Sequence, residues 1–126
     1  MDLSSKIVLI SGPTASGKSE FAIKLAKKIN GEIVNADSMQ VYKELQILSA
    51  RPKIKDYQNI KHHLYGFQSV KNNFSVGDWL KLSKKKITEI QNRKNFTILV
   101  GGKGLYFKSL TDWIIKITDI TIRIRN

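Results

Sequence analysis

The sequence predicts an α/β fold in which a parallel β-sheet is flanked by helices. Short apolar runs of strand length, at residues 6–11, 32–36 and 96–100, alternate with segments of helical periodicity. The first run leads into a glycine-rich turn and a helix, and the third leads into a second glycine-rich turn. Nearly continuous apolar strands are typical of a parallel sheet that is covered on both faces.

The first strand and the first helix are the most clearly marked elements. The strand covers residues 6–11 and the helix residues 17–29. Apolar residues at helical spacing define one face of this helix, namely Phe21, Ala22, Leu25, Ala26 and Ile29. Gly31 is the expected helix stop, because glycine tolerates the left-handed backbone conformation found there. The second strand, 32–36, then places Asp37 at its carboxyl end.

The middle of the chain predicts one long helix after an irregular stretch. We expect a short helical turn at 39–45 and mostly irregular structure at 46–74. Ser75 and Asp78 have the spacing of a capping box, with aspartate in place of glutamate, so a helix should begin there. Its apolar face comprises Val76, Trp79, Leu80, Ile87 and Ile90. The lysine run 84–86 is expected to be a solvated face.

The last quarter of the chain contains the third strand and a second glycine-rich turn. The turn reads Gly101-Gly102-Lys103-Gly104, and a helix should begin at Leu105. Residues 120–125 alternate apolar and polar side chains, which is typical of a strand. No repeat, linker or domain boundary is visible, so we expect a single domain over residues 1–126.

Composition and charge narrow the class of protein. The chain has 126 residues, no cysteine and a formal net charge of +12. The charge suggests a polyanionic partner such as nucleic acid, although A/T-rich codons for Lys, Ile and Asn would also raise it. The absence of cysteine excludes a disulfide framework and suits a cytoplasmic location. No signal peptide and no apolar segment of bilayer length is visible, so no membrane partner is expected.

Residues 12–19 match the phosphate-binding loop pattern G-x-x-x-x-G-K-[ST]. The segment reads Gly12, Pro13, Thr14, Ala15, Ser16, Gly17, Lys18 and Ser19. In such a loop, successive backbone N–H groups surround a di- or triphosphate, the lysine reaches the terminal phosphates and the hydroxyl can bind Mg²⁺. The preceding strand and following helix support a P-loop NTPase-like fold with Mg²⁺ as cofactor. An ordinary β–α turn is the alternative.

Three segments should meet at one edge of the sheet, because parallel strands present their carboxyl ends together. They are the phosphate loop, Asp37-Ser38 and Gly101-Gly102. Asp37 can assist Mg²⁺ binding, act as a general base, or cap the following turn. His62 and His63 are poor joint metal ligands, since adjacent residues in a strand point to opposite faces. We expect them to be structural or exposed.

These motifs, taken together, resemble the tRNA dimethylallyltransferases, the MiaA-type isopentenyl transferases. The phosphate loop is shared with many kinases, whereas the string from Asp37 to Tyr42 is far more specific. The resemblance also rests on Ala50-Arg51-Pro52, His62-His63-Leu64, Gly101-Gly102 and Gly104-Leu105-Tyr106. It covers nearly the whole chain from Ile7 to Leu110 and corresponds to the N-terminal portion of the family.

The resemblance implies transfer of a dimethylallyl group from dimethylallyl diphosphate to N6 of an adenosine beside the anticodon in tRNA. It implies that residues 12–19 hold the diphosphate, with Ser19 near Mg²⁺, and that Asp37 accepts the proton from N6. It also implies that Asp37, Ser38, Met39, Gln40 and the position of Lys103 contact the tRNA. The expected partners are dimethylallyl diphosphate and tRNA, and the chain is expected to be a monomer.

The sequence departs from the family pattern in three ways. Lys103 stands where the family has threonine, and Leu48 stands where it has glycine. The later arginine-rich segment and helical insertion of the family are not found in these 126 residues. We therefore expect a truncated copy of the family, and the resemblance leaves open whether this chain is active or inactive by itself. The alternatives are a small P-loop kinase and a vestigial module that binds diphosphate or RNA without catalysis.

Overall fold

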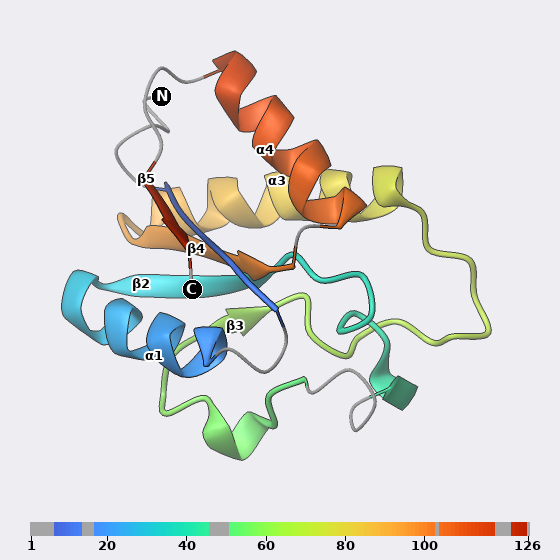
Figure 1. The fold of residues 1–126 in the computed structure, drawn as a ribbon, viewed down its shortest axis with the longest axis horizontal. Coiled ribbons are helices and arrows are strands. Elements are labelled where there is room, and N and C mark those ends of the chain that lie inside the picture. Colours follow the sequence, from blue (N-terminus) through green and yellow to red (C-terminus); the bar gives the residue numbers. More distant parts are fainter. Residues whose placement is uncertain (1–6, 14–16, 46–50, 103, 118–121, 126) are drawn as a thin grey trace.

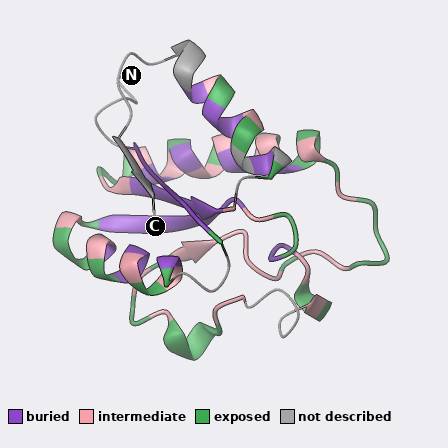
Figure 2. Cartoon of the chain, in the orientation of Figure 1, coloured by how far each residue is buried: buried purple, intermediate pink, exposed green. Residues whose placement is uncertain are grey.

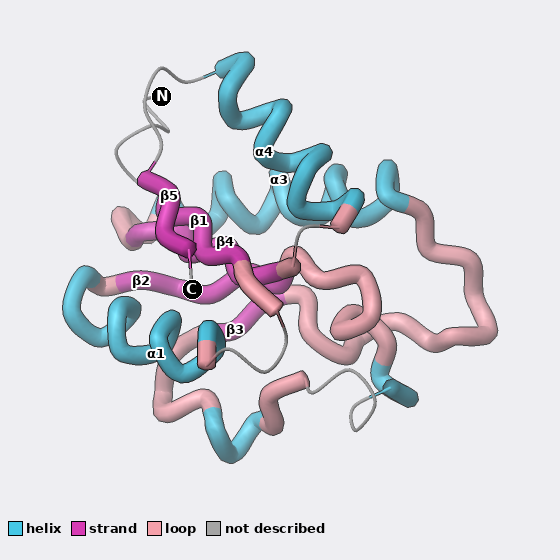
Figure 3. The backbone as a smooth tube through the Cα atoms, viewed as in Figure 1, coloured by secondary structure: helices cyan, strands magenta, loops and turns pink. Residues whose placement is uncertain are grey.

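The computed structural model describes residues 7–13, 17–45, 51–102, 104–117 and 122–125. Within these residues, five parallel strands form one sheet in the order β3-β2-β4-β1-β5 (Figure 1; Figure 3). The strands are β1 (Ile7–Ser11), β2 (Gly31–Asn35), β3 (His62–His63), β4 (Phe96–Gly101) and β5 (Ile122–Arg125). The helices are α1 (Lys18–Ile29), α3 (Val76–Asn92) and α4 (Leu105–Ile117), with short 3₁₀ turns η2 (Lys43–Leu45) and η3 (Ile54–Asp56). The predicted α/β class is confirmed.

The helices cover both faces of the sheet, with α1 on one face and α3 and α4 on the other (Figure 1). Alternate residues of each strand therefore enter two different cores. Val8, Ile10 and Ile33 pack with α1, whereas Ile7, Leu9 and Val34 pack with α3 and α4. Figure 2 shows β1, β2 and β4 buried along their length. This two-sided burial explains why these strands read as continuous apolar runs.

Strand register brings the carboxyl ends of the strands to a common edge. Ser11 of β1 pairs with Gly101 of β4, and Asn35 of β2 pairs with Val100. The backbone N–H of Ala36 extends this ladder by donating to the Val100 carbonyl at 2.8 Å. Asp37 and Gly102, which follow these strands, therefore leave the sheet at the same edge as the phosphate loop. This juxtaposition was predicted from the sequence.

Helix α1 is flanked at each end by a residue in the left-handed backbone conformation. Gly17 is its N-cap with φ 80°, and Asn30 is its C-cap with φ 59°. The expectation that Gly31 stops the helix is wrong, because Asn30 takes the left-handed conformation and Gly31 begins β2. Gly31 is needed there for a different reason. A Cβ atom at this position would lie 2.6 Å from the Ile98 side chain and 3.3 Å from the Ala26 backbone.

The predicted capping box of α3 is present. The Asp78 N–H donates to Ser75 Oγ at 3.0 Å, and the Ser75 N–H donates to Asp78 Oδ2 at 3.0 Å. The predicted apolar face of α3 lies in the core shared with α4. Within the lysine run, Lys85 is exposed, Lys86 lies 3.5 Å from Glu89, and Lys84 lies over the Trp113 ring. The run is therefore only partly a free solvated face.

Two parts of the chain differ from the sequence-based expectation. The stretch expected to be irregular contains η3 and the two-residue strand β3, which pairs with β2. Helix α4, for which only the start at Leu105 was predicted, continues to Ile117. The strand predicted near the end is present as β5, beside β1. In the part of the chain that the structure describes, no helix is long and apolar enough to cross a bilayer.

Candidate functional site

The phosphate loop joins β1 to α1 at the carboxyl edge of the sheet. Gly12 is buried and its N–H donates to the Gly101 carbonyl at 3.3 Å, which ties the start of the loop to β4. Gly17 ends the loop in the left-handed conformation that allows α1 to begin at Lys18. Thr14, Ala15 and Ser16 lie outside the described residues. The described ends of the loop thus match the geometry that the motif predicts.

Lys18 crosses the loop from the first turn of α1. Its Nζ donates to the Gly12 carbonyl at 2.6 Å, and only 4% of the residue is exposed. Burial lowers the pKa of Lys18, and the nearby Asp37 carboxylate opposes that shift. A buried ammonium that donates to a loop carbonyl and lies in the field of a nearby carboxylate is well placed to bind an anionic oxygen. Pro13 is exposed beside it, and Ser19 is half-buried one residue further along α1.

Asp37 lies in a tight turn directly after β2. Its Oδ1 accepts a hydrogen bond from the Met39 N–H at 2.9 Å, which is the turn-capping role considered for this residue. Among the described residues, Oδ2 accepts no hydrogen bond, and no ion pair within 4 Å involves Asp37. The side chain is half-buried and acts electrostatically on Lys18. One carboxylate oxygen therefore fixes the turn while the other is not used by it.

Asn35 is a site residue that the sequence analysis missed. Its side chain is fully buried, donates to the carbonyls of Asp37 and Leu64 at 3.0 Å, and accepts from the Asp37 N–H at 2.9 Å. Its own carbonyl accepts from Trp79 Nε1 at 3.0 Å. A polar residue ending an apolar strand next to Asp37 is the signal that could have identified it. Asn35 thus holds the Asp37 turn in place through four hydrogen bonds.

The segment after Asp37, residues 38–40, is exposed at its first two residues and buried at its last. Gln40 is buried, and its carbonyl accepts from the Gly66 N–H at 2.9 Å. Ser38 and Met39 are exposed, Met39 by 50%. Of the residues that the resemblance assigns to tRNA contact, Ser38 and Met39 are thus accessible, and Gln40 is part of the support.

Gly101 ends β4 and Gly102 follows it, and the space around these two glycines differs. A Cβ atom at Gly101 would lie 2.6 Å from the Ala36 carbonyl oxygen, so only glycine permits this approach of β4 to the Asp37 turn. A Cβ atom at Gly102 would meet nothing within 4 Å. Lys103 lies outside the described residues, as do Leu48, Ser49 and Ala50. Gly101 therefore allows β4 to lie close to Ala36, the residue that precedes Asp37.

The donor set at this edge fits Mg²⁺. The described residues contain no cluster of three His, Cys, Asp or Glu side chains that would hold a metal by themselves. Mg²⁺ is commonly bound through one or two protein oxygens together with substrate phosphates and water. The Ser19 hydroxyl and the Asp37 carboxylate are hard oxygen donors at the edge where the phosphate loop opens, so they would supply such a partial set.

The paired histidines have structural contacts, as expected. His63 Nε2 lies 2.8 Å from Glu32 Oε1, whereas the His62 ring stacks on Tyr57 with centroids 3.8 Å apart. The two imidazole rings thus contact different partners, Glu32 for His63 and Tyr57 for His62. Arg51 also makes a contact within the protein, because its Nη1 donates to the Tyr42 carbonyl at 2.9 Å.

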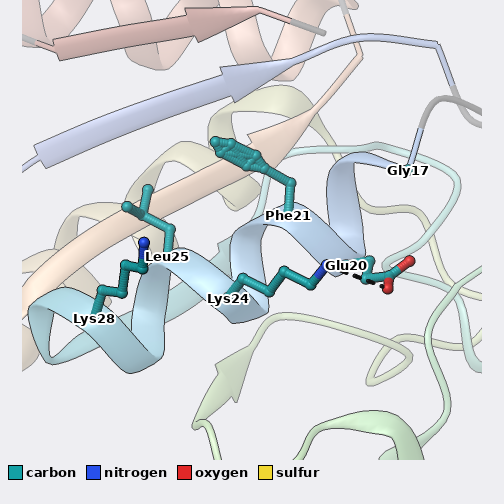
Figure 4. A pocket seen from close by; sticks show the side chains of 6 residues that line it. All are labelled: Gly17, Glu20, Phe21, Lys24, Leu25 and Lys28. Atoms are coloured by element: carbon teal, nitrogen blue, oxygen red, sulfur yellow. Dashed lines mark ion pairs between the residues drawn. The ribbon is translucent and has the colours of Figure 1, made fainter.

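One well-defined cavity lies beside the edge and not on it. Its volume is about 470 Å³, and it is lined by Gly17, Glu20, Phe21, Lys24, Leu25 and Lys28. Figure 4 shows Phe21 and Leu25 pointing toward the strands and an ion pair between Lys24 and Glu20 on the other side. Of the lining residues that the structure describes, only Gly17 belongs to the phosphate loop. We therefore identify the site by its converging polar groups and not by cavity size.

Sequence comparison identifies tRNA dimethylallyltransferases among the relatives of this chain. A model of the family described as IPP transferase matches residues 40–125. A tRNA dimethylallyltransferase of Pelagibacter ubique is 62% identical over 126 residues, which is all of this chain and 40% of the relative. One from Hyphomonas neptunium is 43% identical over 94% of this chain and 37% of the relative. The chain thus spans about 40% of the length of the curated relatives it matches.

Solved structures agree with this result. A tRNA isopentenylpyrophosphate transferase from Bacillus halodurans is 41% identical with a TM-score of 0.79, over 83% of this chain and 35% of that one. The corresponding protein from Staphylococcus epidermidis is 40% identical with a TM-score of 0.79, over 82% of this chain and 34% of that one. By motif, sequence and fold, the chain belongs to the IPP transferase family, the family of the tRNA dimethylallyltransferases.

Proposed function

We propose that the protein takes part in transferring a dimethylallyl group from dimethylallyl diphosphate to N6 of an adenosine in tRNA. The observation that carries this proposal is the placement of Lys18 and Asp37 at one edge of the sheet. Asp37 acts on Lys18 electrostatically, yet it forms no direct ion pair with it within the described residues. This arrangement suits a diphosphate held by Lys18 beside an acceptor that must lose a proton to Asp37.

In the proposed reaction, the allylic C–O bond breaks and its electron pair leaves with the diphosphate. The loop amides and the Lys18 ammonium would stabilise the charge that develops on the leaving oxygens. Mg²⁺ at Ser19 would neutralise further negative charge on the diphosphate when it is bound. The lone pair of N6 forms the new C–N bond, and the proton displaced from N6 goes to the Asp37 carboxylate.

The environment of Asp37 supports a role in proton transfer. Oδ1 is committed to the Met39 N–H, and Asn35 fixes the backbone on both sides of the residue. A carboxylate held in one orientation can accept a proton from a group that is positioned next to it. The net charge of +12 supports binding to the phosphate backbone of tRNA. We place the reaction in the cytoplasm, with the chain acting as a monomer.

A second candidate function is binding without turnover. The observation that favours it is length, because the chain spans about 40% of the curated relatives. On this alternative, the edge of the sheet binds diphosphate and RNA but lacks groups that complete the transfer.

One pair of measurements separates the two candidates. The 126-residue chain is incubated with radiolabelled dimethylallyl diphosphate, Mg²⁺ and tRNA, and label in the tRNA is counted. In parallel, inorganic pyrophosphate binding is measured by calorimetry for wild type and Lys18→Met. The proposal expects label transfer that is lost in Asp37→Asn and kept in Asp112→Asn, a matched change at an exposed site on α4.

Three outcomes are informative. Pyrophosphate binding that depends on Lys18, without any transfer, supports the binding-only function. Transfer of phosphate from ATP to a small acceptor would instead support a kinase. Failure of pyrophosphate to bind wild type would contradict both the transferase and the binding-only proposals.

A further inference from the structure

A second cavity lies beside the Asp37 turn and is not used in the proposed chemistry. Its volume is about 320 Å³, and it is lined by Arg51, Pro52, Lys53, Ile54, Tyr57, Tyr65 and Gly66. These residues belong to segment 51–66, the green part of the chain in Figure 1. We propose that this cavity holds a nucleotide of the RNA strand next to the target adenosine. The inference rests on the proposed function.

The cavity is joined directly to the Asp37 turn. Asn35 Nδ2 donates both to the Asp37 carbonyl and to the Leu64 carbonyl at 3.0 Å, so one side chain supports both segments. The Gly66 N–H donates to the Gln40 carbonyl at 2.9 Å. Burial raises the pKa of the Tyr65 hydroxyl, with further contributions from Tyr57 and Asp37. A nucleotide in the cavity would therefore be a neighbour of a base placed at Asp37.

One wall of the cavity is an aromatic ring that is already held in position. The Tyr57 ring stacks on His62 with centroids 3.8 Å apart and an interplanar angle of 8°. Tyr65 lies 6.4 Å from Tyr57 and 5.7 Å from His62. Nucleic-acid bases stack on aromatic side chains of this kind, and they do so with little dependence on base identity. A fixed ring lowers the conformational cost of binding.

The rest of the lining favours an anion. The described residues of the lining include Arg51 and Lys53 and no carboxylate. Gly66 makes the position of Arg51 possible, because it adopts φ 56° and a Cβ atom there would clash with the Arg51 guanidinium. Lys53 is exposed, and Ile54 next to it is 81% exposed at the rim. Cations beside an aromatic wall match the phosphate and the base of one nucleotide.

A binding experiment on the 126-residue chain tests the inference. The probe is a fluorescent RNA stem-loop with an adenosine in its loop, measured by anisotropy with and without an abasic nucleotide on either side of that adenosine. Wild type should bind the intact loop about fivefold or more tightly than one of the abasic loops. Tyr57→Ala should bind the intact and abasic loops equally, whereas Tyr57→Phe should restore the difference.

Salt dependence tests the cationic part of the cavity. Lys53→Gln should lower the slope of log affinity against log salt by about one, as expected for one lost phosphate contact. Lys85→Gln removes the same charge from an exposed position on α3 and should leave the slope unchanged. A thermal melt of each variant shows that it is folded.

Several results would overturn the inference. They are the absence of RNA binding, abasic discrimination that persists in Tyr57→Ala, and equal effects of Lys53→Gln and Lys85→Gln. These binding measurements do not depend on whether the chain transfers the dimethylallyl group. If they occur while label transfer still depends on Asp37, the proposed function stands without this cavity. If the cavity variants behave as expected but no transfer occurs, the cavity is an RNA site in a protein without turnover.

Discussion

At the scale of single residues, the position of Asp37 depends on Asn35. The two residues exchange hydrogen bonds through side chain and backbone, and Asn35 also donates to the Leu64 carbonyl and accepts from the Trp79 indole. The Trp79 ring in turn stacks on Tyr106, with centroids 4.8 Å apart. The Asp37 turn is therefore anchored to both α3 and α4, although it lies at an exposed edge.

Replacing Asn35 by aspartate should test this anchoring. The carboxylate oxygens of the Asn35→Asp variant cannot donate to the carbonyls of Asp37 and Leu64, so these buried acceptors would be left without a donor and would face a negative charge. We expect a loss of about 3 kcal/mol in the free energy of unfolding, measured by urea denaturation. Ser38→Ala, an exposed change in the same turn, should cost less than about 0.5 kcal/mol. Equal stability of Asn35→Asp and wild type would contradict the anchoring role.

Sequence reasoning could name the candidate site but not its supports. The phosphate loop and Asp37 follow from local patterns at strand ends. Asn35 and Glu32 owe their importance to partners 29 to 63 positions away in sequence, such as Leu64 for Asn35 and Asn95 for Glu32. Such pairs depend on how the elements pack, which a local pattern does not determine. Gln40 illustrates the same limit, because only packing shows that it is buried.

At the scale of elements, the sheet is clamped at the edge opposite the site by a buried carboxylate. Glu32 of β2 accepts hydrogen bonds from Arg93 Nε and Nη2 at 2.8 and 2.7 Å, and from Asn95 Nδ2 at 2.9 Å. His63 of β3 lies 2.8 Å from the same carboxylate. Burial acts to raise the pKa of Glu32, but the hydrogen bonds from Arg93, Asn95 and His63 outweigh it and lower the pKa to about 2.

This clamp predicts a loss of stability in acid. Because the pKa of Glu32 is lower in the folded protein than in the unfolded chain, its contribution is present above pH 4.5 and is lost as the pH falls toward 2. The shift corresponds to about 3 kcal/mol at neutral pH, of which more than half should be gone at pH 3. Urea denaturation of wild type and Glu32→Gln between pH 7 and pH 3 measures it. Parallel pH profiles for the two proteins would refute the clamp.

The turn after β4 offers a matched pair of glycine substitutions. Gly101→Ala places a methyl group 2.6 Å from the Ala36 carbonyl oxygen, so β4 and the Asp37 turn must separate. We expect Gly101→Ala to lower the free energy of unfolding by about 2 kcal/mol. Gly102→Ala meets nothing within 4 Å and should stay within about 0.5 kcal/mol of wild type. Thermal unfolding of both variants checks this, and a reversed order would contradict the geometry.

Element prediction worked where a segment carries a strong pattern. The strands β1, β2 and β4 are nearly continuous apolar runs, the helices α1 and α3 have helical periodicity, and their observed ends lie within a residue or two of the expected ones. Strand β3 was missed because two residues carry no periodicity. The end of α1 at Ile29 was predicted, but the residue that stops the helix was misassigned, because Asn30, and not Gly31, adopts the left-handed conformation. Packing of Gly31 against Ala26 and Ile98 decides this, and it involves a distant strand.

At the scale of the whole molecule, the fold places the buried Glu32 cluster and the candidate site at opposite ends of the strands. The buried clamp at Glu32 lies toward the start of β2, and the converging polar groups lie where β1, β2 and β4 end. The general α/β class and the common edge were predictable, because alternating strands and helices favour a parallel sheet. The cavity lined by residues of segment 51–66 was not, since that segment has no periodic pattern.

The measurement that most directly tests the central claim is the pyrophosphate affinity of Asp37→Asn without Mg²⁺. Asparagine can still accept the Met39 hydrogen bond, so the turn is kept while the negative charge near Lys18 is removed. If the diphosphate binds between Lys18 and Asp37, the variant should bind pyrophosphate severalfold more tightly than wild type and lose transfer to tRNA. Unchanged or weaker pyrophosphate binding would show that Asp37 does not face the phosphate site, and would contradict the account.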